Sequence, residues 1–205
     1  MKSDIKPMAI RDEIAALKRS RIITAAVDLF YENGYDKTTL EAVAERLGVT
    51  KPFLYSHFSS KADLLADICA RGISASLEAM ESVKTLDVTP TERLTLLGQR
   101  FVTAVLDNQM YIAIFTREEK GLEPAALDSI NVMRRTFDRE LTELICEGVA
   151  QDEFTVDDPH MAALSIGGMV SWAYVWFRPN GRLDVSAVAK DMTDLILAMV
   201  KAKNA

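Results

Sequence analysis

The chain has 205 residues, of which 49% are hydrophobic and 26% are charged, a balance that excludes extended disorder and predicts one or two globular domains. The formal net charge of −6 argues against a protein that holds nucleic acid by bulk electrostatics. The charge is uneven, because residues 1–70 carry ten Lys and Arg against ten Asp and Glu, whereas residues 71–205 carry fourteen against twenty. The acidity therefore lies in the second part of the chain.

The first residues and the two cysteines bear on the compartment. Residues 1–12 lack helical periodicity and have charges scattered along them, so they are expected to form a loose arm rather than a signal peptide. Cys69 and Cys146 each lie within an apolar helical pattern, which favours neither a disulfide framework nor a zinc site. The sequence therefore predicts a cytoplasmic protein with no metal and no cofactor.

The first predicted helix spans residues 13–33, and Gly34 follows it as a stop signal. Its apolar face has helical spacing and consists of Ile22, Ile23, Ala26, Leu29 and Phe30. Lys18, Arg19 and Arg21 form a basic cluster before this face. Such a cluster fits either contact with a phosphate or a minor groove, or a solvated start of the helix.

Residues 39–58, TLEAVAERLGVTKPFLYSHF, have the pattern of two short helices joined by a tight turn. Thr38 is expected to cap the first helix through a capping box. Gly48 follows the last apolar residue of that helix, where a left-handed conformation is needed, and so marks the turn. Thr50 is expected to cap the second helix through its hydroxyl, and Pro52 fits its first turn. The order is that of a helix-turn-helix.

The second of these helices carries the functional prediction, because an α-helix fits the major groove of DNA and meets base edges with its N-terminal residues. Lys51 can reach a guanine or a phosphate, whereas Phe53 can only touch a thymine methyl group or a sugar. Tyr55, His57 and Lys61 suit phosphate oxygens. The predicted DNA-binding residues are Thr39, Thr50, Lys51, Pro52, Phe53, Tyr55, His57 and Lys61. The alternative is a helical corner of an all-α protein whose aromatic residues belong to the core.

The run from Ile22 to Ile68 resembles the N-terminal domain of the TetR family of transcriptional repressors. The segments LFYENGYDKTT, LGVTK and LYSHFSSKADLL occur in it in the order and at the spacing usual in the family. The resemblance implies a three-helix DNA-binding head, placed at residues 13–68, on an all-helical dimerisation and effector-binding domain at residues 69–205. Phe53 departs from the family pattern, in which smaller residues are frequent at this position, and this departure concerns the base contact.

The rest of the chain has helical periodicity and no strand pattern, so the predicted fold is all-α. A helix that starts near Ser60 is expected to leave the DNA-binding head and to continue past Gly72 into the second domain. A further helix should begin at Thr89, where a threonine precedes a proline and a glutamate. The other predicted helices are Met110–Thr116, Pro124–Ala150, Met161–Phe177 and Val185–Val200.

The segment Met161–Phe177, MAALSIGGMVSWAYVWF, contains no charged residue. Its seventeen residues are at the short limit for spanning hydrocarbon, and its glycines and serines dilute the apolar character. A helix buried on nearly all sides is therefore expected rather than a membrane span. Together with Val185–Val200 it is predicted to form the interface of a homodimer, with two helices from each subunit, which is also where the family resemblance places the interface.

A small apolar or amphipathic effector is expected to bind in the second domain. The predicted contacts, each of which fits plain core as well, are Phe101, Val105, Met110, Ile114, Met133, Phe137, Met169 and Trp172. Arg117, Arg134 or Arg178 can serve an anionic group of the effector. The segment WFRPNGRLDVSAVAKDMTDLIL is similar to the C-terminal part of family members that sense acyl-CoA thioesters, so an acyl-CoA is a candidate effector.

Together these elements predict a homodimeric repressor that binds a near-palindromic operator in double-stranded DNA, with its two recognition helices in successive major grooves. The effector is expected to release the DNA by a population shift. The alternatives are an effector-independent architectural DNA-binding dimer, a platform for a partner protein, and an α-helical enzyme. The enzyme is disfavoured, because the two histidines, His57 and His160, have no metal-ligand spacing, and neither a phosphate loop nor a serine elbow occurs.

Overall fold

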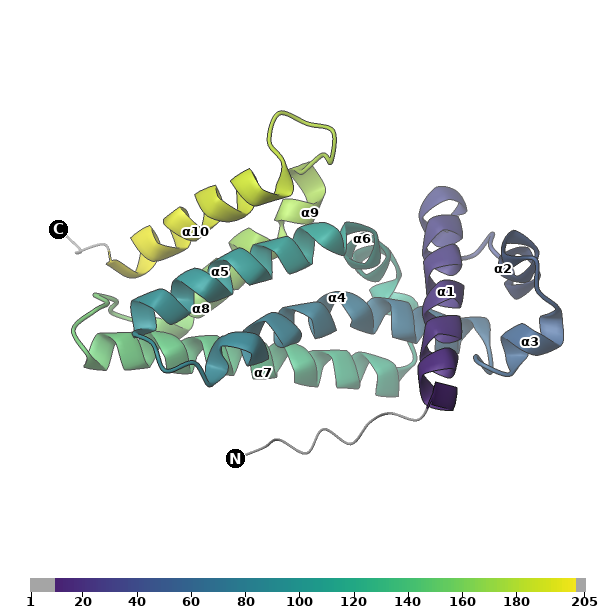
Figure 1. The fold of residues 1–205 in the computed structure, drawn as a ribbon, viewed down its shortest axis with the longest axis horizontal. Coiled ribbons are helices and arrows are strands. Elements are labelled where there is room, and N and C mark those ends of the chain that lie inside the picture. Colours follow the sequence, from purple (N-terminus) through teal and green to yellow (C-terminus); the bar gives the residue numbers. More distant parts are fainter. Residues whose placement is uncertain (1–9, 202–205) are drawn as a thin grey trace. The chain divides into compact units, whose positions relative to one another are not determined.

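The computed structural model describes residues 10–201, which form helices joined by turns, without a strand (Figure 1). The predicted all-α fold is confirmed. The structure divides between Ile68 and Cys69 into two compact units. The first unit contains α1 (Ile10–Asn33), α2 (Leu40–Leu47), α3 (Lys51–Tyr55) and the start of α4 (Lys61–Lys84). The second contains the rest of α4, then α5 (Pro90–Asp107), α6 (Gln109–Glu118), the 3-10 turn η1 (Glu119–Gly121), α7 (Pro124–Ala150), α8 (Pro159–Ser171), α9 (Ala173–Trp176) and α10 (Val185–Lys201).

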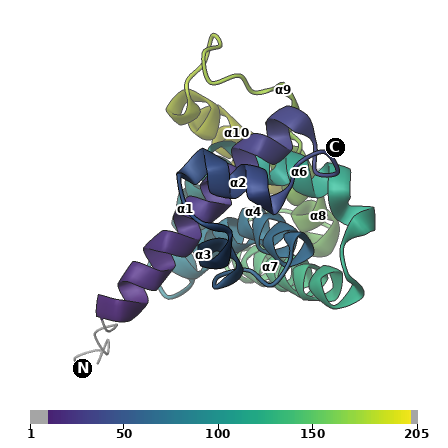
Figure 2. The ribbon, with the colours of Figure 1, turned by 90° about the vertical axis from the view of Figure 1, so that its right-hand side faces the viewer.

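Helix α1 begins at Ile10, so residues 10–12, which were expected to belong to a loose arm, are helical. Residues 1–9 of that predicted arm lie outside the described residues. The first turn of α1 carries Asp12 and Glu13, whose negative charges are favourable at the positive end of the helix dipole. These charges extend the helix beyond the apolar repeat from which its start was predicted. Figure 2 shows α1 running past α2 and α3 and extending beyond them at its N-terminal end.

The core of the first unit holds α2 and α3 in place. Its largest fully buried side chains are Ile22, Phe30, Leu54, Phe58, Leu64, Leu65 and Ile68. Helix α3 has only five residues, too few to be stable as an isolated helix. Its one buried side chain, Leu54, has no exposed surface, and burying a leucine contributes about 1.5–3 kcal/mol. The recognition helix therefore depends on tertiary packing.

The turn between α2 and α3 has the predicted backbone but different caps. Gly48 has a φ of 66°, the left-handed conformation expected there. Helix α2 is capped by Thr39, whose hydroxyl oxygen accepts a hydrogen bond from the N–H of Ala42 at 3.2 Å. Thr38, the predicted cap, is buried instead, and its hydroxyl donates to carbonyl groups at the end of α1. The side chain of Thr50 makes no capping hydrogen bond to α3.

The second unit is built around α5, which packs against α7, α8, α9 and α10. The predicted start of α5 is confirmed: the hydroxyl of Thr89 accepts a hydrogen bond from the N–H of Glu92, and the carboxylate of Glu92 accepts one from the N–H of Thr89. This capping box satisfies two backbone donors at the helix start. The buried face of α5 consists of Pro90, Leu94, Leu97, Gly98, Phe101, Val102, Val105 and Leu106.

The segment Met161–Phe177 differs from its prediction. It is not one helix, because α8 ends at Ser171 and α9 is a separate short turn. Nor is it buried on nearly all sides, since several large side chains are exposed: Met161, Leu164, Trp172, Val175 and Trp176. One face of the segment packs in the core through Ala163, Ile166, Val170 and Ala173, so an uncharged run does not by itself indicate burial all round. None of the helices within residues 10–201 combines the length and the apolar character needed to cross a membrane.

A tight contact at Gly148 in α7 allows the packing of the second unit to be tested by substitution. The ring of Phe154 lies directly against the backbone of Gly148, where a Cβ atom would overlap the ring. Phe154 is 3% exposed, so it cannot move away without losing its packing. We expect Gly148→Ala to lower the free energy of unfolding by about 1–3 kcal/mol, as overpacking does.

Urea unfolding followed by circular dichroism measures this loss. The matched control is Gly121→Ala, because a Cβ atom at residue 121 meets no heavy atom within 4 Å. The control should change the free energy of unfolding by less than about 0.5 kcal/mol. Equal losses in the two variants would contradict the placement of Phe154.

Candidate DNA interface and ligand pocket

Helix α3 presents most of its side chains to solvent. Four of its residues are exposed or half-buried: Lys51, Pro52, Phe53 and Tyr55. Because Leu54 points into the core, these side chains are available to an external partner. The helix ends at Tyr55, so His57, which was expected within the recognition helix, lies in the turn that follows it.

Lys51 is engaged with a carboxylate on the neighbouring helix. Its ammonium lies 2.8 Å from the carboxylate of Glu41 in α2. The hydrogen bond from Lys51 holds the pKa of Glu41 below its ordinary value. The two side chains are 60% and 45% exposed, so their ion pair contributes little to stability. Lys51 can therefore leave Glu41 for a stronger anionic or base partner.

Phe53 is held by two neighbours in the first unit. Its ring packs edge-on against the ring of His57, with the centroids 5.1 Å apart. The ammonium of Lys18, on α1, lies 5.7 Å from the centroid of Phe53. Phe53 thus joins α3 to the following turn and to α1, and the remaining part of its ring offers only an apolar surface.

Arg19, part of the basic cluster on α1, is used inside the first unit. Its guanidinium donates hydrogen bonds to the carboxylate of Asp67, at 2.8 Å, and to the backbone carbonyl of His57. It also lies over the ring of Phe58, 4.0 Å from the centroid. These contacts join α1, the turn after α3, and α4. Arg19 therefore has neither of the two roles predicted for the basic cluster, contact with DNA or exposure to solvent at the helix start.

Lys61, a predicted phosphate contact, also faces inward. Its ammonium donates to the carbonyl groups of Tyr35 and Thr38, both at 3.0 Å, and lies over the ring of Tyr35. A third carbonyl, that of Asp36, lies 3.5 Å away. An ammonium has three N–H donors, so these carbonyls account for its bonding capacity. The sequence could not show this, because the acceptors are backbone groups of the turn after α1.

The two threonines among the predicted DNA contacts lie at helix starts and are exposed. Thr39 keeps its hydroxyl proton for another partner, because its oxygen acts as the acceptor for the cap of α2. Thr50 has a hydroxyl that caps nothing. Both side chains therefore remain available at the surface of the first unit.

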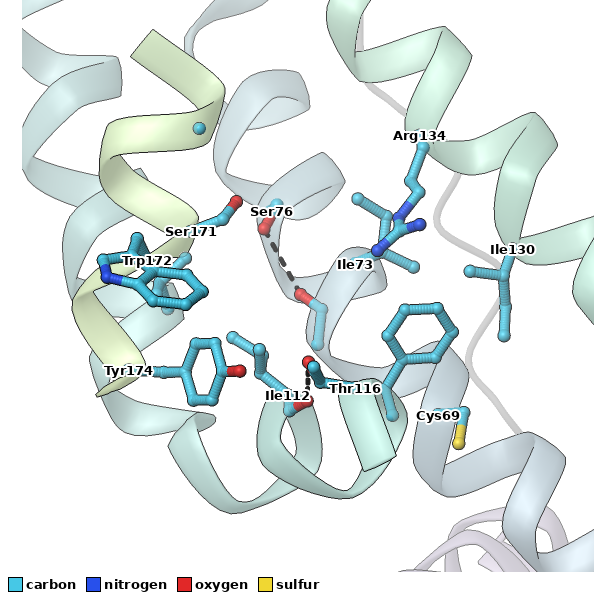
Figure 3. Close-up of a pocket in the computed structure, with 14 residues that line it drawn as sticks. Cys69, Ile73, Ser76, Ile112, Thr116, Ile130, Arg134, Ser171, Trp172 and Tyr174 are labelled. Atoms are coloured by element: carbon cyan, nitrogen blue, oxygen red, sulfur yellow. Dashed lines mark hydrogen bonds between the residues drawn. The ribbon is translucent and has the colours of Figure 1, made fainter. Parts of the chain in front are cut away.

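The second unit contains a pocket of about 330 Å³ (Figure 3). Its lining comes from α4 to α9 and consists of Cys69, Gly72, Ile73, Ser76, Val105, Ile112, Phe115, Thr116, Ile130, Arg134, Gly168, Ser171, Trp172 and Tyr174. The volume lies at the lower end of the range of about 300–1,000 Å³ that small-molecule sites occupy.

Val105 and Trp172 are the two predicted effector contacts that line this pocket. The other six lie outside its lining: Phe101, Met110, Ile114, Met133, Phe137 and Met169. Phe101 and Phe137 pack on each other in the core with their ring centroids 4.6 Å apart. Periodicity identifies the inward face of each helix but not the place where facing helices leave space. Three of the six, Phe101, Ile114 and Phe137, are instead buried in the core.

The residues that sequence reasoning missed are mostly small or polar. Gly72 and Ser76 lie one helical turn apart on α4 and so share the face that borders the pocket. A Cβ atom at residue 72 would lie only 2.9 Å from the side chain of Ile112, so the glycine permits the close approach of α6. Two small residues at this spacing were the signal that the sequence offered.

Arg134 is the one charged side chain among the fourteen residues that line the pocket. Its guanidinium lies over the ring of Phe115, 4.5 Å from the centroid, and 4.0 Å from the carboxylate of Glu119. The separation from Glu119 is too long for a hydrogen bond, so the N–H groups of Arg134 can serve a ligand. The hydroxyl of Tyr174 points toward the same space in Figure 3 and makes no hydrogen bond to another described residue.

Cys69 lines the pocket as a small apolar group. Burial raises the pKa of its thiol to about 12, and the carboxylates of Glu118 and Glu119 add to this effect. The thiol is therefore protonated at neutral pH and is a poor nucleophile. In residues 10–201 no group of three or more His, Cys, Asp and Glu side chains is placed to hold a metal ion.

Two family models match the chain. The model described as "Tetracyclin repressor-like, C-terminal domain" matches residues 87–200, and the model described as "Bacterial regulatory proteins, tetR family" matches residues 22–68. The chain belongs to the TetR family. The resemblance drawn from Ile22–Ile68 is confirmed, and as a TetR-family protein the chain is a DNA-binding transcriptional regulator.

Solved structures and characterised relatives of this TetR-family protein align over most of its length. A regulatory protein from Rhodococcus RHA1 is 27% identical, with a TM-score of 0.81, and the match covers 91% of this chain and 98% of that one. AibR, solved in complex with isovaleryl coenzyme A and operator DNA, is 26% identical with a TM-score of 0.73, covering 89% and 97%. The fatty acid metabolism regulator protein of Bacillus subtilis (strain 168) is 24% identical over 189 residues, covering 91% and 97%.

Proposed function

We propose that this TetR-family protein is a homodimeric repressor that binds a near-palindromic operator through α3 and is released from it by a small amphipathic effector in the pocket of the second unit. The pocket is the observation that carries the proposal, because an exposed helix-turn-helix also occurs in DNA-binding proteins that sense nothing. A filled core would favour an effector-independent architectural dimer. A largely apolar pocket of about 330 Å³, with one cationic side chain in its lining, favours a sensor.

The DNA-binding part of the proposal assigns base and phosphate contacts to α3 and its flanks. Lys51 and Tyr55 are exposed polar residues of this helix, and Thr39 and Thr50 offer hydroxyls at the starts of α2 and α3. Phe53 and Pro52 supply apolar contacts to a thymine methyl group or a sugar. In a dimer the two copies of α3 enter major grooves about 34 Å apart, one turn of the double helix.

The homodimer is supported by an exposed apolar surface on α8, α9 and α10. Its large side chains are between 36% and 61% exposed and comprise Met161, Leu164, Trp172, Val175, Trp176 and Leu195. Exposed apolar residues gathered on a few elements mark an interaction surface. The presence of two tryptophans agrees with the enrichment of aromatic residues at protein interfaces. A second copy of the chain is the partner we assign to it.

The effector part of the proposal follows from the chemistry of the pocket. The apolar lining fits a short acyl chain, Arg134 fits an anionic group, and Tyr174 can donate a hydrogen bond to a carbonyl oxygen. Isovaleryl coenzyme A, the ligand of AibR, combines a short apolar acyl group, a thioester carbonyl and phosphates. We therefore propose a short-chain acyl-CoA thioester, or a related carboxylate, as the effector.

Release of DNA requires that the effector bind the DNA-free form of the dimer more tightly than the bound form. A coupling free energy of about 1–3 kcal/mol is typical of such pairs of sites. The effector then shifts the population toward dimers whose two recognition helices do not match the spacing of successive major grooves.

The first prediction concerns the recognition helix. We expect Lys51→Ala and Tyr55→Phe each to weaken binding to an operator selected by the wild-type protein from random-sequence duplexes. The loss should be about 1–3 kcal/mol if Lys51 contacts a base, and about 0.5–1.5 kcal/mol for the hydrogen bond from Tyr55 to a phosphate. The matched control is Glu41→Gln, which removes the carboxylate that holds Lys51 in the free protein. This control should bind as tightly as the wild type or more tightly. Band-shift titrations at fixed salt decide, and wild-type affinity in both Lys51→Ala and Tyr55→Phe would refute the placement of the recognition surface.

The second prediction concerns assembly. We expect wild-type protein to have twice the chain mass of 22.8 kDa at micromolar concentration, and the double variant Leu164→Glu, Leu195→Glu to be monomeric. The reason is that two carboxylates from each chain cannot be desolvated in the interface. Light scattering measures the mass. Val132→Glu is the control, because Val132 is 54% exposed on α7 and lies outside the proposed interface. A monomeric wild type that bound its operator fully would refute the dimer.

The third prediction concerns the effector. We expect short-chain acyl-CoA thioesters to bind the wild type in calorimetric titrations and to bind Arg134→Gln roughly tenfold to a hundredfold more weakly, because a charge-assisted hydrogen bond contributes about 1.5–3 kcal/mol. Arg135→Gln, one residue further along α7 and exposed, is the control. Linkage requires that operator DNA weaken thioester binding by the factor by which the thioester weakens operator binding. Equal thioester affinities with and without operator would show that the ligand is not an inducer.

A further inference from the structure

The N-terminal half of α1 borders a second concave surface in the first unit. This concavity, called here the α1 groove, has a volume of about 370 Å³ and is lined by Ile10, Arg11, Ile14, Ala15, Lys18 and His57. It is therefore formed by two cations, an imidazole and aliphatic side chains.

Helical spacing places the cations and the carboxylates at the start of α1 on different faces of the helix. Arg11 and Lys18 are seven residues apart, which is about two turns, and so lie on the same face of the helix. The acidic residues Asp12 and Glu13 follow Arg11 directly and do not line the groove. The α1 groove is therefore cationic even though this part of the helix carries both signs of charge.

Within residues 10–201, the two cations of the groove have no carboxylate partner. Three other cations of the first unit form ion pairs: Arg19 with Asp67, Arg46 with Glu32, and Lys51 with Glu41. Arg11 and Lys18 form none with the described residues. An unpaired cation on an exposed helix face is free to neutralise an external anion at no cost in lost ion pairs.

The groove is continuous with the recognition surface. His57, which lines it, is the second residue after α3, and the ammonium of Lys18 lies 5.7 Å from the ring centroid of Phe53 in α3. Arg11 lies about 10 Å further along the axis of α1, at 1.5 Å per residue. A nucleic-acid strand that passes α3 can therefore reach both cations.

We propose that the α1 groove binds the sugar–phosphate backbone of operator DNA beside the bases that α3 contacts. Arg11 and Lys18 each neutralise one phosphate, and Ile14 and Ala15 pack against the deoxyribose between them. This inference rests on the proposed DNA binding and adds a contact surface to it. It also gives a role to exposed aliphatic residues, because Ile10 is 75% and Ile14 48% exposed beside the two cations.

The salt dependence of binding tests the groove. The probe is the duplex that the wild-type protein selects from random sequences, and the variant is the double substitution Arg11→Ala, Lys18→Ala. Each lost phosphate contact lowers the slope of log K against log salt by about 0.9, so the slope should fall by about two. At 0.1 M salt the same loss corresponds to roughly fiftyfold weaker binding. Hydroxyl-radical footprinting should show the lost protection on backbone positions beside the bases contacted by α3.

The matched control is the double substitution Lys120→Ala, Arg135→Ala, which removes two exposed cations of the second unit. Its slope should equal that of the wild type, and Arg11→Lys should retain most of the wild-type slope. A groove variant with the slope and footprint of the control would overturn the inference. An unchanged slope with fewer copies bound per duplex would also overturn it, because the groove would then contact a second copy of the chain. A wild type that selects no duplex would overturn the proposed function itself.

Discussion

The proposed DNA-binding surface depends on the anchoring of a five-residue helix, α3, that is too short to be stable on its own. Leu54 is the one buried side chain of α3, and its packing is supported by contacts at both ends of the helix. At its start, Gly48 turns the chain in a left-handed conformation. After its end, Arg19 binds the carbonyl of His57, and Phe58 is buried beside it. Residues that face the protein interior thus determine where Lys51 and Tyr55, the proposed DNA contacts, are presented at the surface.

Sequence reasoning predicted well what depends on neighbouring residues and less well what depends on distant ones. The left-handed Gly48 and the capping box at Thr89 follow from rules that span a few residues, and both are present. The cap of α2 was placed one residue too early, because Thr38 is buried and its hydroxyl donates to the carbonyl groups of Leu29 and Gly34. Lys61 was assigned to phosphate because its acceptors lie more than twenty residues away in the chain. Long-range hydrogen bonds of this kind leave no periodic signal.

The pocket and the surface of α8–α10 show a second limit of sequence reasoning. An apolar residue at helical spacing can be buried in the core of its own chain or exposed on a surface that binds a partner. The spacing in the sequence is the same in both cases. Phe137 was predicted in a binding site and lies in the core, whereas Trp172 was predicted in a buried helix and is 61% exposed. The distance between facing helices determines whether an apolar side chain borders a cavity or packs against another side chain. That distance is governed partly by small residues such as Gly72, whose lack of a side chain lets Ile112 approach.

Net charge describes this chain poorly, because some of its cations are held in ion pairs and others are not. Residues 1–70 have equal numbers of positive and negative residues, yet their cations differ in availability: Arg19 is bound by Asp67, while Lys18 has no carboxylate partner among the described residues. The same distinction applies in the second unit, where Arg134 lies 4.0 Å from Glu119, too far to be satisfied by it. A cation that lacks a close carboxylate loses little on meeting an external anion, whereas a paired cation must first give up its partner. The arrangement of carboxylates around each cation therefore decides which positive charges an acidic chain can offer to DNA or to an anionic effector.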